Sequence, residues 1–254
     1  MKLLFTICAR AGSKGVKNKN IRNFLNHPLV YYTLSAFKIF KERYERNFEM
    51  IHLAVNTDSD ELINQVNQFN IDYIFVKRKE HLSGDTVSKP DVIKDTVGQA
   101  EQNIQSTYDI IIDLDLTSPI RTVDDVYNII NALQDDSNTD VVFSMANARR
   151  SPYFNQVNRK ESGYYSTVFQ SKFVSRQEAP VCYDMNASIY AYKRKFIMNE
   201  TTRRVFDGNA IGVVVKDTAV LDIDNEEDLE LMEVIAEYFF RNYGEYKEIY
   251  QYIN

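Results

Sequence analysis

Short apolar runs alternate with helix-like segments through the first 145 residues of the chain. Buried strands are expected at residues 3–9, 51–56, 73–76, 108–114 and 141–145, and the segments between them suit helices at 28–41, 59–69, 89–104 and 123–133. Strands that alternate with helices in this way pair mostly in parallel, and the helices cover the sheet. The pattern therefore predicts an α/β domain with a mostly parallel sheet.

The alternation is interrupted between residues 149 and 180 by an aromatic stretch of mixed charge. This stretch is typical of a β-rich insertion, and exposed aromatic side chains on such an arm pack against a second subunit or fold back on their own domain. Core segments then return at 187–192, 211–215 and 221–224, followed by helices at 226–241 and 243–253. The sequence leaves both roles of the arm open.

The first expected strand ends in a loop of small residues and cations. In sheets of this kind ligands gather at the carboxyl ends of the strands. Glycines allow a close backbone approach and fixed cations neutralise charge, so the loop suits a polyphosphate. It lacks the endings of a P-loop and of a dinucleotide-binding turn. The alternative is a solvated surface turn. The residues concerned are Arg10, Gly12, Lys14, Gly15, Lys17 and Lys19.

Asp222 and Asp224 alternate at the end of the last expected strand, so their carboxylates share one face. Mg²⁺ prefers oxygen ligands and bridges substrate phosphates, and one or two aspartates near a phosphate loop are enough to hold it. The alternative is that Asp224 and Asn225 cap the following helix. From the residues alone both interpretations stand.

Charge, cysteine content and hydrophobicity limit the partners and the cellular compartment that suit this chain. The formal net charge of −6 is spread in mixed signs, which argues against nucleic acid or an anionic membrane as a partner. Two cysteines, Cys8 and Cys182, show no pairing or metal-ligand spacing, which fits a reducing, cytoplasmic setting. The apolar run at 3–9 ends in Arg10, and no segment approaches the roughly 18 apolar residues of a membrane span. We therefore expect a soluble protein.

Asp113 and Asp115 open an Asp-x-Asp-x-Thr pattern that ends at Thr117. The pattern matches haloacid-dehalogenase phosphatases, in which the first aspartate is the nucleophile and the second a general acid. Here it follows three strand–helix units, and the residues after it do not resemble the flap of that family. A phosphatase that uses Asp113 and Asp115 is kept as an alternative.

Four segments together resemble the acylneuraminate cytidylyltransferases, or CMP-sialic acid synthetases. They are residues 9–15 with Lys19 and Asn20, 116–121, 176–190 and 222–229, and their order and spacing span nearly the whole chain. The resemblance implies a Rossmann-like α/β domain, with helices on both faces of the sheet, formed by residues 1–148 and 181–254. It also implies a dimerisation arm at 149–180 and a homodimer.

The implied reaction joins CTP to a nine-carbon 2-keto acid sugar and releases pyrophosphate, with Mg²⁺ as cofactor. By the same resemblance Arg10, Lys14, Asp222 and Asp224 are catalytic, and the two aspartates bind the metal. The implied nucleotide-binding residues are Arg10, Ala11, Gly12, Ser13, Lys14, Lys19, Asn20, Arg78 and Ser88. The implied sugar-binding residues are Asp115, Thr117, Ser118, Arg121, Arg176, Gln177 and Asn186.

Two departures from the sialic acid pattern bear on the sugar. Most sialic acid enzymes carry Gln-Pro where this chain has Asp115-Leu116, and many place an arginine and a proline near Asp184 and Met185. Replacing Gln by Asp removes an amide donor and leaves only acceptors, so the facing sugar groups should differ. The chain looks more like the bacterial branch that activates legionaminic acid, and 3-deoxy-manno-octulosonate and pseudaminic acid are further alternatives.

Overall fold

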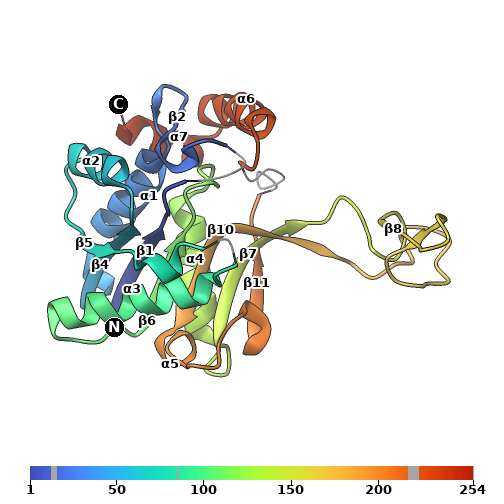
Figure 1. The fold of residues 1–254 in the computed structure, drawn as a ribbon, viewed down its shortest axis with the longest axis horizontal. Coiled ribbons are helices and arrows are strands. Elements are labelled where there is room, and N and C mark those ends of the chain that lie inside the picture. The colour runs from blue at the N-terminus through green and yellow to red at the C-terminus, as the bar shows by residue number, and fades with distance from the viewer. Residues whose placement is uncertain (13–15, 85, 217–222, 254) are drawn as a thin grey trace.

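A central sheet organises the computed structural model, which describes residues 1–12, 16–84, 86–216 and 223–253 (Figure 1). Within these residues the sheet has seven strands in the order β11-β7-β10-β6-β1-β4-β5. Neighbouring strands run parallel, except that β10 is antiparallel to both β6 and β7. The strands are β1 (Lys2–Cys8), β4 (Met50–Thr57), β5 (Ile74–Lys77), β6 (Ile110–Leu114), β7 (Val141–Asn147), β10 (Tyr183–Lys193) and β11 (Ala210–Val214).

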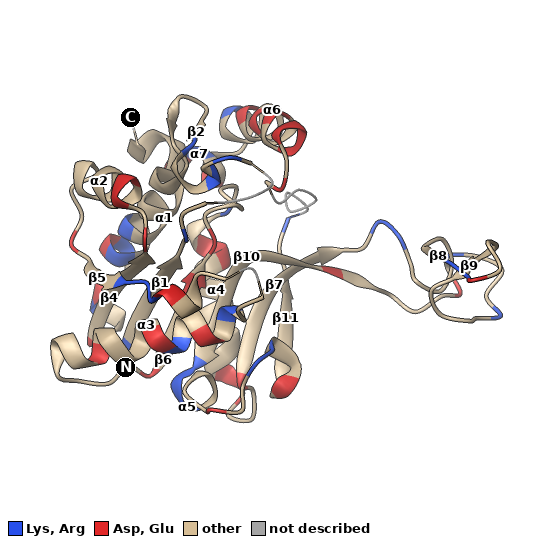
Figure 2. Cartoon of the chain, viewed as in Figure 1, with Lys and Arg blue, Asp and Glu red and all other residues tan. Residues whose placement is uncertain are grey.

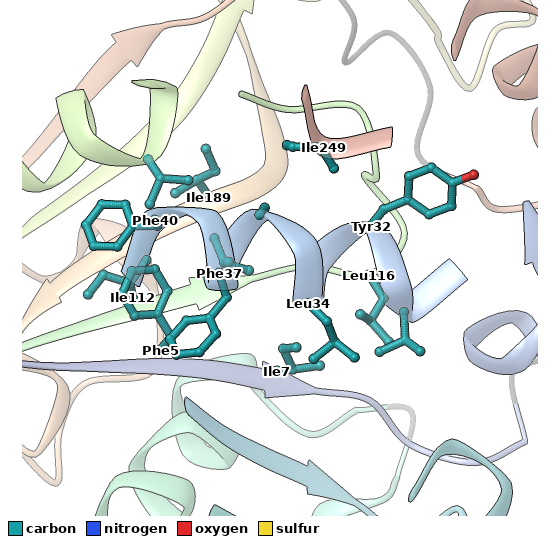
Figure 3. Close-up of a cluster of buried hydrophobic side chains, with 14 of the residues drawn as sticks. Phe5, Ile7, Tyr32, Leu34, Phe37, Phe40, Ile112, Leu116, Ile189 and Ile249 are labelled. Carbon is teal, nitrogen blue, oxygen red and sulfur yellow. The ribbon is translucent and has the colours of Figure 1, made fainter. Parts of the chain in front are cut away.

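Helices cover both faces of the sheet, as the resemblance implies. Alternate side chains of β1 point to opposite faces. Phe5 packs against Phe37 and Phe40 of α1 (Figure 3), and Phe5 and Ile7 belong to a core cluster that also includes residues of α4, α6 and α7. Leu4 belongs to the cluster that includes residues of α3 and α5. Burying each such side chain contributes about 1.5–3 kcal/mol. The helices are α1 (Leu29–Tyr44), α2 (Asp60–Gln68), α3 (Lys89–Ile104), α4 (Val123–Asp135), α5 (Arg194–Ile197), α6 (Glu226–Asn242) and α7 (Gly244–Ile253).

Smaller elements complete the described chain. Two-stranded ribbons form between β2 and β3 and between β8 and β9. Their bounds, with those of the 3₁₀ turns, are η1 (Lys19–Ile21), β2 (Asn23–Phe24), β3 (His27–Pro28), η2 (Glu45–Asn47), η3 (Glu80–Leu82), β8 (Val157–Arg159), β9 (Tyr165–Thr167) and η4 (Val205–Asp207).

The structure confirms the predicted alternation of strands and helices and corrects one element. The strand predicted at 221–224 is wrong at Ile223 and Asp224, the two of its residues that the structure describes, because neither belongs to a strand. Ile223 is instead a buried core residue whose N–H donates to the Thr117 carbonyl at 3.4 Å. The other half of the predicted strand, Leu221 and Asp222, lies outside the described residues.

The segment between β7 and β10 projects away from the sheet as an arm (Figure 1), with the β8–β9 ribbon at its far end. Tyr164, Tyr165 and Val174 on this arm are highly exposed. The limits of the arm at 149 and 180, and its contact with a second subunit, stay predictions. Among the described helices none is both long enough and apolar enough to cross a membrane.

Candidate active site

A polar cavity of about 440 Å³ lies at the carboxyl ends of β1 and β6. This is the edge of a parallel sheet at which ligands are expected. Most of its charged wall comes from residues predicted from sequence, which the fold brings together from distant parts of the chain. The lining residues are Cys8, Arg10, Lys19, Asn20, Arg78, Leu82, Gly84, Val87, Lys89, Val92, Asp115, Thr117 and Asp224.

The predicted nucleotide loop begins directly after β1. The Arg10 guanidinium donates to the Ser83 carbonyl at 2.9 Å, and Asn20 Nδ2 donates to the Arg10 carbonyl at 2.9 Å. The Ala11 N–H donates to Asp58 Oδ1 at 2.6 Å, so Asp58 anchors the loop. Gly12 has φ +72°, a left-handed conformation that favours glycine. The predicted residues Ser13 and Lys14 lie outside the described residues.

Arg78 lines the cavity from the segment that follows β5. Only 7% of it is exposed, and its Nε donates to Asn56 Oδ1 at 2.8 Å. Burial lowers the pKa of Arg78, and Asn56 is itself held by Thr96 at 2.9 Å. The predicted residue Ser88 does not line this cavity. It caps α3, where its Oγ accepts from the Asp91 N–H at 3.2 Å, and it borders a neighbouring hollow.

Asp224 closes the cavity beside Lys19. Its carboxylate is 78% exposed and lies 3.4 Å from Lys19 Nζ, which also donates to the Ile223 carbonyl. Of the two residues that could cap α6, Asn225 provides the side-chain cap, because its side chain accepts from the Asp228 N–H at 2.9 Å. Asp224 joins that cap only through its backbone N–H, so its carboxylate stays available to the cavity. Its predicted partner Asp222 lies outside the described residues.

The donor set on the described residues suits a cation only in part. No group of three His, Cys, Asp or Glu residues in that part of the chain could hold a metal ion. Mg²⁺ needs less protein than that, because it keeps several waters and takes ligands from substrate phosphates. A single exposed carboxylate at Asp224, next to cations suited to phosphates, fits such a site.

Lys89 was not among the residues predicted from sequence. It is the first residue of α3, and its Nζ lies 2.7 Å from Asp113 Oδ2 and 2.8 Å from Asp115 Oδ2. Burial would lower the pKa of Lys89, but the two carboxylates outweigh burial and raise that pKa well above its usual value. The local sequence offers no signal for this pairing, because Lys89 and its partners come from separate elements.

The phosphatase alternative is not supported by this geometry. Asp113 is fully buried, its Oδ1 accepts from the Thr6 hydroxyl at 2.8 Å and its Oδ2 faces Lys89. A nucleophile must reach its substrate, and Asp113 is enclosed. Cys8 lines the cavity, but burial and the nearby Asp113 raise the pKa of its thiol to about 12, so this cysteine stays protonated.

The predicted sugar-binding residues divide into three groups. Asp115 and Thr117 line the cavity, and Thr117 donates from N and Oγ1 to Asp115 Oδ1 at 2.9 and 2.8 Å. Ser118, Arg121 and Asn186 are buried, and they are not among the described residues that line the cavity. Arg176 and Gln177 instead border a separate hollow of about 250 Å³ at the base of the arm, where Arg176 donates to the Ala148 carbonyl at 2.8 Å.

Lys, Arg, Asp and Glu residues are spread over the whole protein (Figure 2). Against this mixed background, four cations gather around one cavity. Arg10, Lys19, Arg78 and Lys89 converge there against Asp115 and Asp224. A site of this kind binds a polyanion and holds polar groups in fixed positions. The geometry defines an α/β protein with a polar site suited to a polyanion.

Comparison with known proteins identifies the family. The model of the family described as cytidylyltransferase matches residues 4–244, so the chain belongs to the cytidylyltransferases and is a nucleotidyltransferase. The resemblance found in the sequence is thereby confirmed.

Two Campylobacter proteins are each 33% identical to this chain, and each match covers 92% of this chain and 94% of the relative. They are the post-translational flagellin modification protein B of Campylobacter coli and the CMP-N,N'-diacetyllegionaminic acid synthase of Campylobacter jejuni. The N-acylneuraminate cytidylyltransferase of Escherichia coli is 26% identical over 91% of this chain and 51% of its own length.

A solved structure supports the fold assignment. The CMP:2-keto-3-deoxy-manno-octonic acid synthetase complexed with CTP superposes with a TM-score of 0.63. The match covers 94% of this chain and 99% of that protein at 17% identity. At this identity the likeness concerns the fold alone, and it agrees with the mixed sheet and the helices on both faces described above.

Proposed function

We propose that this cytidylyltransferase joins CTP to a nonulosonic acid of the legionaminic type, giving a CMP-sugar and pyrophosphate. The observation that carries the proposal is the cavity at the end of β1, where Arg10, Lys19 and Arg78 surround a space that also presents Asp115 and Asp224. A nucleoside triphosphate meets cations on one side, and a polar sugar acid meets hydrogen-bonding groups on the other. The 33% identity to a legionaminic acid synthase supports the choice of sugar.

The chemistry asks for positioning more than for covalent work. The anomeric hydroxyl of the sugar acid attacks the α-phosphorus of CTP in line, a new P–O bond forms, the bond to pyrophosphate breaks, and the hydroxyl proton is released to solvent. Arg10 and Lys19 are suited to neutralise charge on the leaving phosphates, and Lys14 has the same proposed role. Aligned binding of two substrates supplies up to about 7–11 kcal/mol of the barrier reduction.

Magnesium is part of the proposal, with Asp224 and Asp222 as its protein ligands. When bound, the ion polarises the α-phosphate and lowers the pKa of the attacking hydroxyl. Asp224 offers the exposed carboxylate that this role needs. Lys19 Nζ lies 3.4 Å from that carboxylate.

The arm supports a further part of the proposal, a homodimer in which residues 149–180 contact the second subunit. Tyr164, Tyr165 and Val174 expose large apolar surfaces that a partner would cover.

Both cysteines are free thiols, which is consistent with the cytoplasm as the proposed location of the protein.

Replacing Arg10 with glutamine is expected to impair both binding of CTP and turnover. The guanidinium lines the cavity and its charged hydrogen bonds to phosphates are each worth about 1.5–3 kcal/mol, so kcat/KM for CTP should fall about 10- to 100-fold. Steady-state release of pyrophosphate with varied CTP measures the effect. An Arg10→Gln variant with unchanged KM for CTP and unchanged kcat would show that Arg10 does not bind the phosphates.

The substrate is tested by pyrophosphate release from CTP and Mg²⁺. Legionaminic, N-acetylneuraminic and pseudaminic acids and 3-deoxy-manno-octulosonate are assayed in parallel, and mass spectrometry identifies the products. Release with a legionaminic acid, together with the mass of its CMP derivative, is expected. Preference for another acid would reassign the sugar, and no release with any of the four would overturn the proposal.

A further inference from the structure

We propose that Lys89 is a positioning residue for the sugar acid: it holds the Asp115 carboxylate against the cavity wall as a hydrogen-bond acceptor, so that the site selects a sugar that presents an N–H or O–H donor there. The inference rests on the proposed function and deepens it. It concerns residues of α3 and β6 that meet only in the folded protein.

The Lys89 ammonium lies against a fully buried aspartate, Asp113, on the side away from the cavity. Asp113 accepts from the Thr6 hydroxyl at 2.8 Å, and its other oxygen lies 2.7 Å from Lys89 Nζ. The Tyr190 ring, with its centroid 5.5 Å from the ammonium, covers a further side. A buried carboxylate that does not reach the cavity has no contact with substrate, so the role of Asp113 is to orient the ammonium.

Asp115 is held from two directions at the cavity wall. Its Oδ1 takes both hydrogen bonds from Thr117, and its Oδ2 takes the bond from Lys89 at 2.8 Å. About 24% of its side chain is exposed, compared with 1% for Asp113. A carboxylate has about four lone-pair positions, and the three bonds from described residues take three of them, so one acceptor position is left for a ligand as far as the described part of the chain is concerned.

The charge of Lys89 decides what Asp115 offers to that ligand. Burial alone would raise the pKa of Asp115, but Lys89 and Thr117 outweigh burial and hold that pKa well below its usual range. Two neighbouring carboxylates without the ammonium would repel each other and one would take up a proton. A protonated Asp115 would donate a hydrogen bond instead of accepting one, and the selection would be lost.

The sheet order separates this pair from Arg78. Arg78 follows β5, on one side of β1, whereas Asp115 follows β6, on the other. Arg78 and the Lys89–Asp115 pair therefore reach the cavity from opposite sides of β1, and the Lys89 ammonium is already paired with Asp113 and Asp115. Losing Lys89 should change the use of the sugar acid far more than the binding of CTP.

The test compares Lys89→Gln with the wild type in steady-state pyrophosphate release, using CTP, Mg²⁺ and the sugar acid that the wild type accepts. We expect KM for the sugar acid to rise about tenfold or more, with KM for CTP within about twofold. The acid limb of kcat/KM for the sugar should move to higher pH, because the pKa of Asp115 rises without its cation. The charged and titratable groups facing the pair are Cys8, Arg78, Asp113, Arg121, Tyr190 and Tyr192.

Two further variants keep the test decisive. Lys89→Arg retains the positive charge, so the acid limb of its kcat/KM for the sugar acid should lie at the wild-type pH. If Lys89→Gln does not fold, Lys89→Gln with Asp113→Asn removes the unpaired buried charge and should still move the acid limb to higher pH, because Asp115 has lost its cation. The matched control is Lys195→Gln, since Lys195 is exposed, pairs with Asp140 at 3.5 Å and lies outside the cavity lining.

The outcomes separate the two proposals. An active wild type, with an unchanged sugar KM and an unchanged acid limb in Lys89→Gln, would overturn the role of Lys89 and leave the cytidylyltransferase reaction intact. A wild type that releases no pyrophosphate with any of the four acids would overturn the proposed function, and this inference with it.

Discussion

Replacing Asp224 with asparagine is expected to lower kcat about 10²- to 10³-fold, with KM for CTP changed by less than about threefold. Asparagine keeps the size of the side chain and removes the charge that faces the cavity. Asp224 enters the cap of α6 only through its backbone N–H, which donates to Asp228 Oδ2 at 3.1 Å. The substitution therefore leaves the helix cap in place, and the loss should fall on turnover.

Pyrophosphate release at several Mg²⁺ concentrations measures this effect, and the variant should need more Mg²⁺ for half-maximal rate. Glu226→Gln is the matched control, because Glu226 lies two residues away and is bound to Arg22 at 2.9 and 3.0 Å, outside the cavity lining. Exposed ion pairs of this kind contribute about 0.2–1 kcal/mol, so the control should keep its kcat within about twofold. An unchanged kcat in Asp224→Asn would remove this residue from the proposed metal site.

Much of the fold follows from local signals in the sequence. Helix α3 begins at Lys89, where it was expected, because Ser88 is a good cap and Pro90 suits the first turn. Strand β1 was visible as an apolar run, and its alternate side chains fill both halves of the core. The cations that follow β1 pointed to the cavity because ligands gather at the carboxyl ends of parallel strands.

Other features depend on contacts between distant segments, which no local pattern encodes. The pairing of Ile189 with Leu114 inserts β10, antiparallel, between β6 and β7. The Asp-x-Asp-x-Thr pattern matched a phosphatase because spacing does not reveal that Asp113 is enclosed. Lys89 meets Asp113 and Asp115 only through the packing of α3, so its role could not be predicted from its neighbours in the sequence.

Replacing Arg121 with alanine is expected to destabilise the protein by about 3–5 kcal/mol, the combined cost of a cavity and of buried carbonyls without donors. Only 2% of Arg121 is exposed, its Nε donates to the Ser118 carbonyl at 3.2 Å, and its Nη2 donates to the Asp115 carbonyl. Burial lowers its pKa to about 10, which leaves it charged at neutral pH. These contacts indicate that Arg121 holds the loop from Asp115 to Ser118 in place.

Thermal unfolding without substrates distinguishes this role from the predicted contact with the sugar. At about 2–4 °C per kcal/mol for a chain of this size, Tm of Arg121→Ala should fall by about 10 °C. Arg241→Ala is the matched control, since Arg241 lies on the surface of α6 and pairs with the exposed Glu237 at 2.8 Å, so its Tm should change by less than about 2 °C. An Arg121→Ala protein with the wild-type Tm and a raised KM for the sugar acid would show that Arg121 acts on the substrate and not on the loop.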